Sequence, residues 1–192
     1  MGREFELKFA ASAADHDALQ ARFRNLSPIS METTYYDTPF GDIRRLRWTL
    51  RHRLENGFSV CALKTPGEGF GHGEWEVHSS CIEEAIVPLL AKGAPMQLAD
   101  FAAAGLVPVC GAQFTRLAGL IDTPECTVEL ALDSGFLLGG GKELPLCEIE
   151  IELKAGSEEA AAAFAMLLAQ EYGLRPETRS KIARAMELAA RE

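Results

Sequence analysis

Two carboxylates and an ammonium group alternate with apolar side chains close to the start of the chain. Glu4, Glu6 and Lys8 are separated by Phe5 and Leu7, and residues that alternate in this way share one face of a β-strand. Neighbouring carboxylates can hold a hard divalent cation, and an ammonium group beside them can hold an anion. A solvated sheet face is the ordinary explanation for one such strand. The same pattern, however, returns along most of the chain.

The sign of the alternating charge differs from one predicted strand to the next. Carboxylates repeat on strands predicted near residues 74–77, 126–133 and 146–154, and cations repeat near residues 46–54. Unpaired charges at this density would destabilise a protein interior. A polyphosphate with divalent ions would neutralise both sets. The charged positions are Glu4, Glu6, Glu74, Glu76, Glu129, Asp133, Glu148, Glu150 and Glu152 on the acidic side, and Lys8, Arg51, Arg53, Lys64 and Arg116 on the basic side.

The alternating pattern predicts about eight strands separated by hairpins, together with two or three helices. Arg47, Thr49, Arg51 and Arg53 share one face of the strand predicted over residues 46–54. Such strands could form a half-solvated sheet or a closed barrel. The ordering of charge by strand favours an α+β fold, an eight-stranded antiparallel β-barrel with the charges inside and helices packed on the outside. A barrel of this size is wide enough for one small ligand.

The overall composition limits the class of protein and its partners. A length of 192 residues fits one domain spanning residues 1–192, and no apolar run is long enough for a membrane helix. The charged start does not resemble a signal peptide, so we expect a cytoplasmic protein without a membrane partner. The net charge of −9 disfavours nucleic-acid binding through a basic surface.

Cysteine and histidine spacing argues against a zinc or thiolate site. The five cysteines include no CxxC pair, and the four histidines form no HExxH motif. A metal bound by this chain would therefore be a hard cation on carboxylates, Mg²⁺ or Mn²⁺.

The ordered set of charged motifs resembles the CYTH family, the triphosphate tunnel metalloenzymes. The resemblance begins at the ExExK motif formed by Glu4, Glu6 and Lys8 and spans essentially the whole chain. It implies an eight-stranded antiparallel tunnel that hydrolyses a terminal phosphoanhydride with Mg²⁺ or Mn²⁺. The further matching segments are Leu50-Arg51-His52-Arg53, Lys64, Glu74 and Glu76, Arg116, Asp133, Glu148 to Lys154, and Arg179-Ser180-Lys181.

The resemblance also implies roles for individual residues. Glu4, Glu6 and Lys8 would be catalytic. It leaves open which two of Glu148, Glu150 and Glu152 reach the metals, and it does not separate Glu74 from Glu76. The implied phosphate-binding residues are Lys8, Arg51, Arg53, Lys64, Arg116 and Lys181, and the implied metal ligands are Glu4, Glu6, Glu76, Asp133, Glu148 and Glu150.

The resemblance does not determine the substrate, because the family includes several triphosphate enzymes. The stretch from Cys147 to Gly156 is most similar to bacterial inorganic triphosphatases, so we expect hydrolysis of inorganic triphosphate. Thiamine triphosphatase, class IV adenylate cyclase and a non-catalytic polyphosphate- or nucleotide-binding module remain alternatives. Trp48 and Trp75 lie on the apolar faces of their predicted strands, which indicates core packing rather than an aromatic clamp. A homodimer is plausible for the family.

Overall fold

One antiparallel sheet forms the framework of the protein. The computed structural model describes the backbone of residues 2–66 and 72–190, and the side chains of residues 5–66 and 73–190. The strand order is β1-β6-β5-β4-β3-β7-β8-β9-β2-β10. The strands are β1 (Gly2–Glu4), β2 (Glu6–Ala10), β3 (Ser27–Asp37), β4 (Thr49–Glu55), β5 (Phe58–Pro66), β6 (His72–His78), β7 (Val107–Asp122), β8 (Cys126–Gly139), β9 (Lys142–Gly156) and β10 (Arg175–Pro176); the helices are α1 (Ala13–Arg22), α2 (Asp42–Arg45), α3 (Ile82–Ala91), α4 (Gln97–Ala103), α5 (Glu158–Tyr172) and α6 (Lys181–Ala189).

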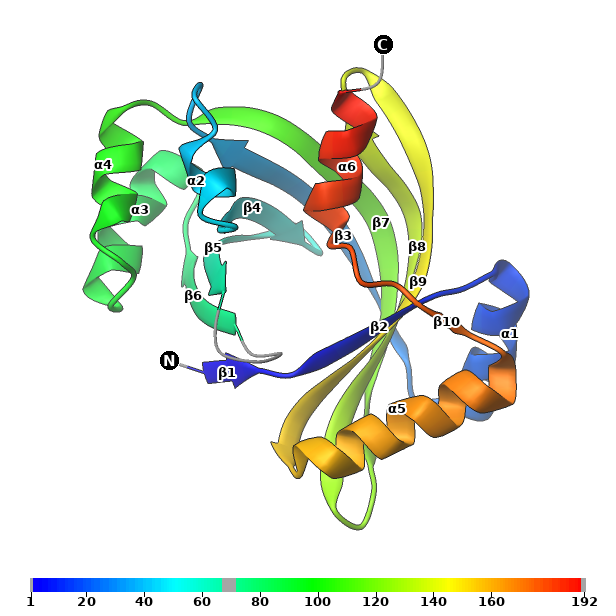
Figure 1. The fold of residues 1–192 in the computed structure, drawn as a ribbon. Coiled ribbons are helices and arrows are strands. Elements are labelled where there is room, and N and C mark those ends of the chain that lie inside the picture. Colours follow the sequence, from blue (N-terminus) through cyan, green and yellow to red (C-terminus); the bar gives the residue numbers. More distant parts are fainter. Residues whose placement is uncertain (1, 67–71, 191–192) are drawn as a thin grey trace.

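The expected α+β, antiparallel and barrel-like architecture is confirmed (Figure 1). The described sheet has ten strands rather than eight. The N-terminal strand is interrupted at Phe5, and β10 adds a two-residue pair with β2. β1 pairs with β6, whereas β2 pairs with β9 near the other edge of the sheet. The sheet is therefore not closed by hydrogen bonds between strands alone, and the backbone at Phe5 connects its two sides.

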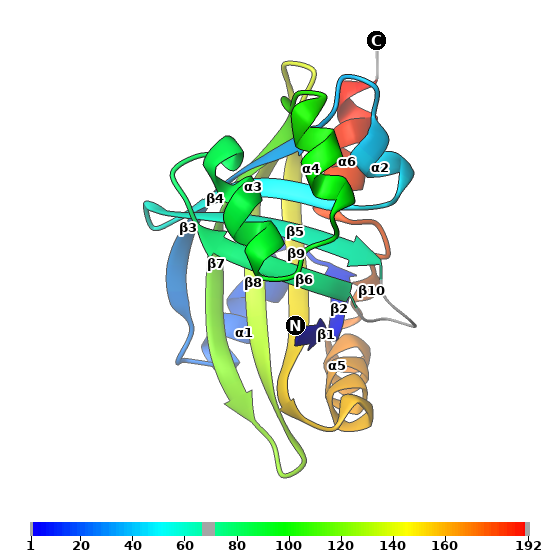
Figure 2. The same cartoon turned by 90° about the vertical axis from the view of Figure 1, so that its left-hand side faces the viewer.

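Two groups of helices cover the outer, apolar face of the sheet. Helices α3 and α4 pack on β4, β5 and β6, where Leu50, Leu63 and Trp75 belong to one buried cluster (Figure 2). Helices α1 and α5 pack on β2, β8 and β9 around a second cluster that includes Leu130 and Ile151. Because side chains alternate along a strand, these outward apolar residues leave the charged residues between them facing inward. In the described part of the chain, no helix is long and apolar enough to cross a bilayer.

Helix α6 departs from the expectation that the helices pack on the outside. Ala185 of α6 belongs to a buried cluster with Met31, Ala112, Leu137 and Leu146. These four strand residues have the same parity as the charged inward positions, so α6 lies against the inner face of β7, β8 and β9 (Figure 1). One end of the inner face is apolar, and burial of an amphipathic helix there is favourable. α6 thereby carries its first residues to the edge of the charged interior.

The close approach of α6 to β8 depends on Gly139. A Cβ atom at this position would lie 2.2 Å from the backbone oxygen of Ala185 and 2.9 Å from the backbone nitrogen of Ala189. We expect Gly139→Ala to push the helix away and to lower the free energy of unfolding by about 1–3 kcal/mol, the usual cost of overpacking. Urea denaturation measures this change. An unaltered unfolding midpoint would show that α6 can shift without cost.

Candidate active site

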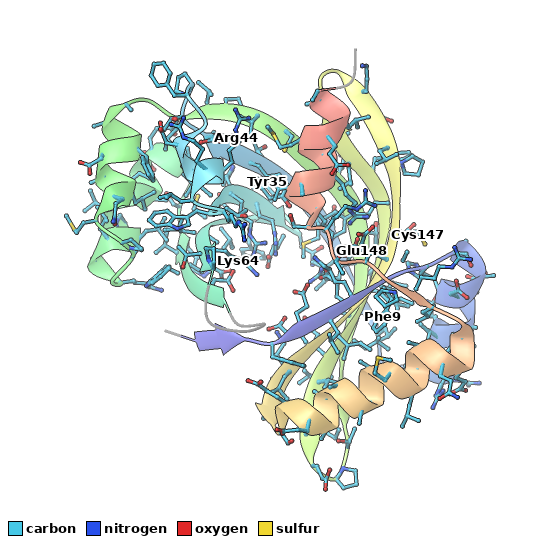
Figure 3. The ribbon with its side chains drawn as sticks, in the orientation of Figure 1. Phe9, Tyr35, Arg44, Lys64, Cys147 and Glu148 are labelled. Carbon is cyan, nitrogen blue, oxygen red and sulfur yellow. The ribbon has the colours of Figure 1, made fainter. Side chains whose placement is uncertain are left out.

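The inner face of the sheet surrounds a cavity of about 750 Å³ with charged walls. Lys64 on β5 and Glu148 on β9 lie on opposite sides of the enclosed space (Figure 3). Six predicted phosphate-binding residues line this cavity together with six carboxylates from the acidic set, among them Glu129 and Glu152. The cations are Lys8, Arg51, Arg53, Lys64, Arg116 and Lys181, and the other four carboxylates are Glu6, Glu74, Glu76 and Glu150.

Three carboxylates form a buried group on the β8–β9 wall. Asp133 pairs directly with Glu148 in the β8–β9 register, and Glu150 follows two residues later on the same face. One oxygen from each of the three lies within 4.8 Å of the others. Asp133 and Glu148 are fully buried and Glu150 nearly so. The antiparallel pairing and the two-residue repeat of the Glu148–Glu150 segment therefore produce the cluster, which we call the carboxylate trio.

Two predicted phosphate-binding residues neutralise part of the carboxylate trio. Arg116 lies opposite Asp133 in the β7–β8 register and makes a two-pronged contact, with Nε and Nη2 each 2.7 Å from a carboxylate oxygen. Lys181 Nζ lies 2.7 Å from Asp133 Oδ2 and 2.7 Å from Glu150 Oε1, and it also contacts Glu148. Ser180 caps the N-terminus of α6 by accepting a hydrogen bond from the Ala183 N–H, which fixes where Lys181 enters the site.

Burial and charge pairing act in opposite directions on the pKa values here. Burial alone would lower the pKa of Lys181, but Glu150, Asp133 and Glu148 raise it well above its ordinary value. Burial would raise the pKa of Glu150, but Lys181, Arg116 and Lys8 hold it well below its ordinary value. Both groups are therefore charged at neutral pH, and the pairing stabilises them in the protein interior.

Arg184 is a member of this network that the sequence reasoning missed. Its guanidinium pairs with Glu148 and lies 3.9 Å from Glu177. With Arg184 included, three cations face the three carboxylates of the trio, so their formal charges cancel. The sequence offered one indication of this role: Arg184 follows Lys181 by three residues, which places both side chains on one helix face.

The opposite wall carries a second set of predicted residues. Lys64 and Glu74 are paired in the β5–β6 register, with Nζ and Oε1 3.5 Å apart. Arg51 Nη2 lies 3.2 Å from the same carboxylate. Arg53 contacts Glu55 at 2.9 Å, and its buried Nε has no hydrogen-bond partner among the described residues. Burial, reinforced by the charge of Arg51, lowers the pKa of Arg53. Such a wall favours the arrival of an anion.

Among the residues whose side chains the structure describes, the other predicted metal ligands do not join the carboxylate trio. Glu6 lies 3.8 Å from Lys8 on β2, and the exposed Glu76 is on β6. Glu152 lies 2.8 Å from Lys154 and is absent from the trio, although the sequence pattern does not separate it from its neighbours. The side chain of Glu4 lies outside the described residues.

The CYTH domain family matches residues 2–186 of this chain. The chain is a CYTH-domain protein. Its sequence is 27% identical over 205 residues to the inorganic triphosphatase of Haemophilus influenzae. That alignment covers 100% of this chain but 56% of the relative, so the CYTH domain described here spans about half the length of that protein.

Solved structures support the CYTH fold independently of sequence. HpAC1 of Hippeastrum, an adenylyl cyclase candidate described as having a dominant triphosphatase activity, is 18% identical with a TM-score of 0.68, covering 97% of this chain and 96% of that one. Protein PH1819 of Pyrococcus horikoshii is 22% identical with a TM-score of 0.66, covering 96% and 99%. A Bacillus halodurans protein assigned as an adenylate cyclase is 19% identical with a TM-score of 0.64, covering 96% and 98%. At these identities the likeness concerns the fold alone.

Proposed function

We propose that this CYTH domain is a metal-dependent triphosphatase that hydrolyses inorganic triphosphate to diphosphate and phosphate. The observation that carries the proposal is the composition of the cavity: cations line both walls, and three buried carboxylates lie behind one of them. The similarity to the inorganic triphosphatase of Haemophilus influenzae supports the same substrate.

The cationic residues would bind the phosphate chain from two sides. Arg51 and Lys64 reach the cavity from β4 and β5. Lys8, Arg116 and Lys181 reach it from the opposite wall, where Lys8 pairs with Glu150 in the β2–β9 register. Guanidinium groups and ammonium groups form strong charge-assisted hydrogen bonds with phosphate oxygens. The partnerless Nε of buried Arg53 supports this assignment, because an unsatisfied buried donor is costly unless a ligand completes it.

The carboxylate trio fits a hard divalent cation by its chemistry. All three members offer oxygen donors, the ligands that Mg²⁺ and Mn²⁺ prefer, and they are close enough to share one ion. A bound ion of this kind would polarise a phosphoryl oxygen and lower the pKa of a water molecule. Lys181 and Arg116, which now neutralise the trio, would then be released to bind the phosphate chain. Glu4, Glu6 and Lys8 remain the proposed catalytic residues; Glu6 and Lys8 are on β2, the neighbour of β9, and Glu4 is on β1.

The aromatic residues of the cavity favour an inorganic substrate over an organic triphosphate. Among the described lining residues the aromatic side chains are Tyr35 and Phe114, and both are buried. Trp75 is buried in the outer core, and Trp48 packs edge-to-face on Phe101 with ring centroids 5.8 Å apart. A thiazolium or adenine group would need an accessible ring for stacking. This distribution supports inorganic triphosphate rather than thiamine triphosphate or ATP.

Phosphate release from tripolyphosphate, thiamine triphosphate and ATP, each with Mg²⁺, Mn²⁺ or EDTA, tests the proposal. We expect fast release from tripolyphosphate with either metal and a loss of release in EDTA. Comparable phosphate release from thiamine triphosphate, or formation of cyclic AMP from ATP, would show that the substrate is an organic triphosphate instead of inorganic triphosphate. Binding of tripolyphosphate without turnover would instead indicate a non-catalytic module.

A further inference from the structure

Arg47 occupies a backbone conformation that normally belongs to glycine. Its φ angle is 57°, in the left-handed region, where a non-glycine residue carries a steric cost. The position follows the end of helix α2: the Arg47 N–H donates to the Arg44 carbonyl at 2.9 Å, and the Trp48 N–H donates to the Ile43 carbonyl at 3.1 Å. This pairing is the Schellman motif, in which glycine is preferred at the position held by Arg47.

The surrounding structure fixes this conformation. The Asp37 carboxylate accepts hydrogen bonds from the backbone N–H groups of Thr38 and Ile43 at 2.8 and 2.9 Å, which ties the start of α2 to the end of β3. Ile43 is fully buried in the outer core. The chain therefore maintains a strained backbone at Arg47, and strained residues cluster at functional sites.

The side chain of Arg47 lines the charged cavity, and no residue with a described side chain provides it with a counter-ion. Arg47 is exposed and lines the cavity beside Thr49 and Arg51, so it lies at the cavity entrance. Within residues 5–66 and 73–190, its guanidinium forms no ion pair or hydrogen bond. The cavity cations Arg51 and Lys181, by contrast, are paired with carboxylates. A guanidinium without a counter-ion can bind an anion without first breaking an existing ion pair.

We propose that Arg47 is a further substrate-binding residue, which attracts the triphosphate at the cavity entrance and contacts its outermost phosphate. This inference rests on the proposed function and extends it, because Arg47 does not belong to the phosphate-binding set given by the family resemblance. The charge of Arg47 adds to the row formed by Arg51 and Arg53 on the same wall. Its contribution concerns binding, since Arg47 is exposed and precedes β4, whereas the carboxylate trio is buried on β8 and β9.

The test separates the side chain from the backbone strain. Arg47→Gly removes the charge and relieves the strain, Arg47→Asn removes the charge with a residue that tolerates the left-handed region, and Arg47→Lys keeps the charge. We expect the Gly and Asn variants to raise the KM for tripolyphosphate about three- to fivefold, the size of one exposed charged contact, with kcat within about twofold. The Lys variant should recover most of the loss.

Thermal unfolding shows whether weaker binding is a folding defect. The Tm of Arg47→Gly should equal or exceed that of the wild type by up to about 4 °C. The matched control is Arg45→Gln, which removes the same charge from the exposed end of α2, away from the cavity lining; its KM should stay within about twofold. The proposal is overturned if the KM is unchanged in the Gly and Asn variants, or if Arg45→Gln raises the KM equally. It is also overturned if the Gly and Asn variants both have a lower Tm together with weaker binding.

Calorimetric binding of tripolyphosphate in EDTA distinguishes failure of this inference from failure of the proposed function. If the wild type binds tripolyphosphate in EDTA but does not hydrolyse it when Mg²⁺ or Mn²⁺ is supplied, the triphosphatase proposal fails, and Arg47 is then judged by the Kd values of the same variants. A three- to fivefold weaker Kd in Arg47→Gly would still support the contact, at about the energy of one exposed ion pair. An equal Kd would reject it.

Discussion

Replacing Lys181 by methionine should reduce phosphate release from tripolyphosphate by about 100-fold or more, the usual effect of removing one preorganised charge from an active site. The same change should lower the free energy of unfolding by about 3–5 kcal/mol, because it leaves buried carboxylates without a partner. Lys181 Nζ contacts all three members of the carboxylate trio. Methionine keeps a long apolar side chain, so packing changes little. Steady-state kinetics and urea denaturation measure the two effects.

The stability loss in Lys181→Met should depend on pH in a defined direction. In the wild type, burial opposes ionisation of Glu150, but Lys181 and the neighbouring cations hold its pKa well below the ordinary value of 4.5. A depressed carboxylate pKa stabilises the protein at pH values above 4.5, and that contribution is lost as the pH falls through the folded-state pKa. Without Lys181 the contribution is diminished. The difference in unfolding free energy between wild type and variant should therefore be largest above about pH 4.5 and become smaller below it.

Lys154→Met provides a matched control for Lys181→Met. Lys154 also lines the cavity and contacts two carboxylates, Glu152 at 2.8 Å and Glu129 at 3.6 Å. It is 36% exposed, however, against 10% for Lys181. A partly exposed pair contributes at most about 1 kcal/mol, so the control should lose far less stability and activity. Equal losses in the two variants would show that the buried position of Lys181 has no special importance.

The alternating pattern of the strands allowed the charged faces to be predicted from sequence. Strand parity placed Lys64, Glu74 and Arg116 on the inner face, and all three line the cavity. It placed Trp75 on the opposite face, where it is buried beneath α3 and α4. These predictions succeeded because a two-residue period determines the face of a side chain regardless of which strands become neighbours.

Register and long-range packing could not be obtained from this pattern. Parity gives Glu148, Glu150 and Glu152 the same face, and only the pairing of Asp133 with Glu148 shows which of them share a cluster. Helix α6 was expected outside, because nothing local shows that the apolar residues Met31 and Leu137 form an inner surface that needs a cover. Arg184 was missed for the same reason, since its role depends on where α6 packs. The strand predicted from residue 46 instead begins at Thr49 after helix α2, which is why the strain at Arg47 was not foreseen.

The second large effect is expected for Glu150→Gln, which should reduce metal-dependent phosphate release by about 100-fold or more. Glutamine has nearly the same shape as glutamate but lacks its charge, so the trio would lose one anionic donor to a divalent cation. Glu148→Gln should act similarly and should also leave Lys181 and Arg184 with one carboxylate fewer. Binding of Mn²⁺ in the absence of substrate, followed by electron paramagnetic resonance, should weaken in both variants.

Glu152→Gln makes this prediction selective, because it applies the same chemical change two residues further along the same face of β9. Glu152 pairs with Lys154 and lies across the register from Glu129 and Glu6, outside the carboxylate trio. The loss of Mn²⁺ affinity in Glu152→Gln should therefore be several times smaller than the loss in Glu150→Gln. If instead Glu152→Gln abolished Mn²⁺ binding while Glu150→Gln retained it, the metal would belong to the row formed by Glu6, Glu129 and Glu152. The buried trio would then act only as the electrostatic anchor that holds Arg116 and Lys181 in the wall of the cavity.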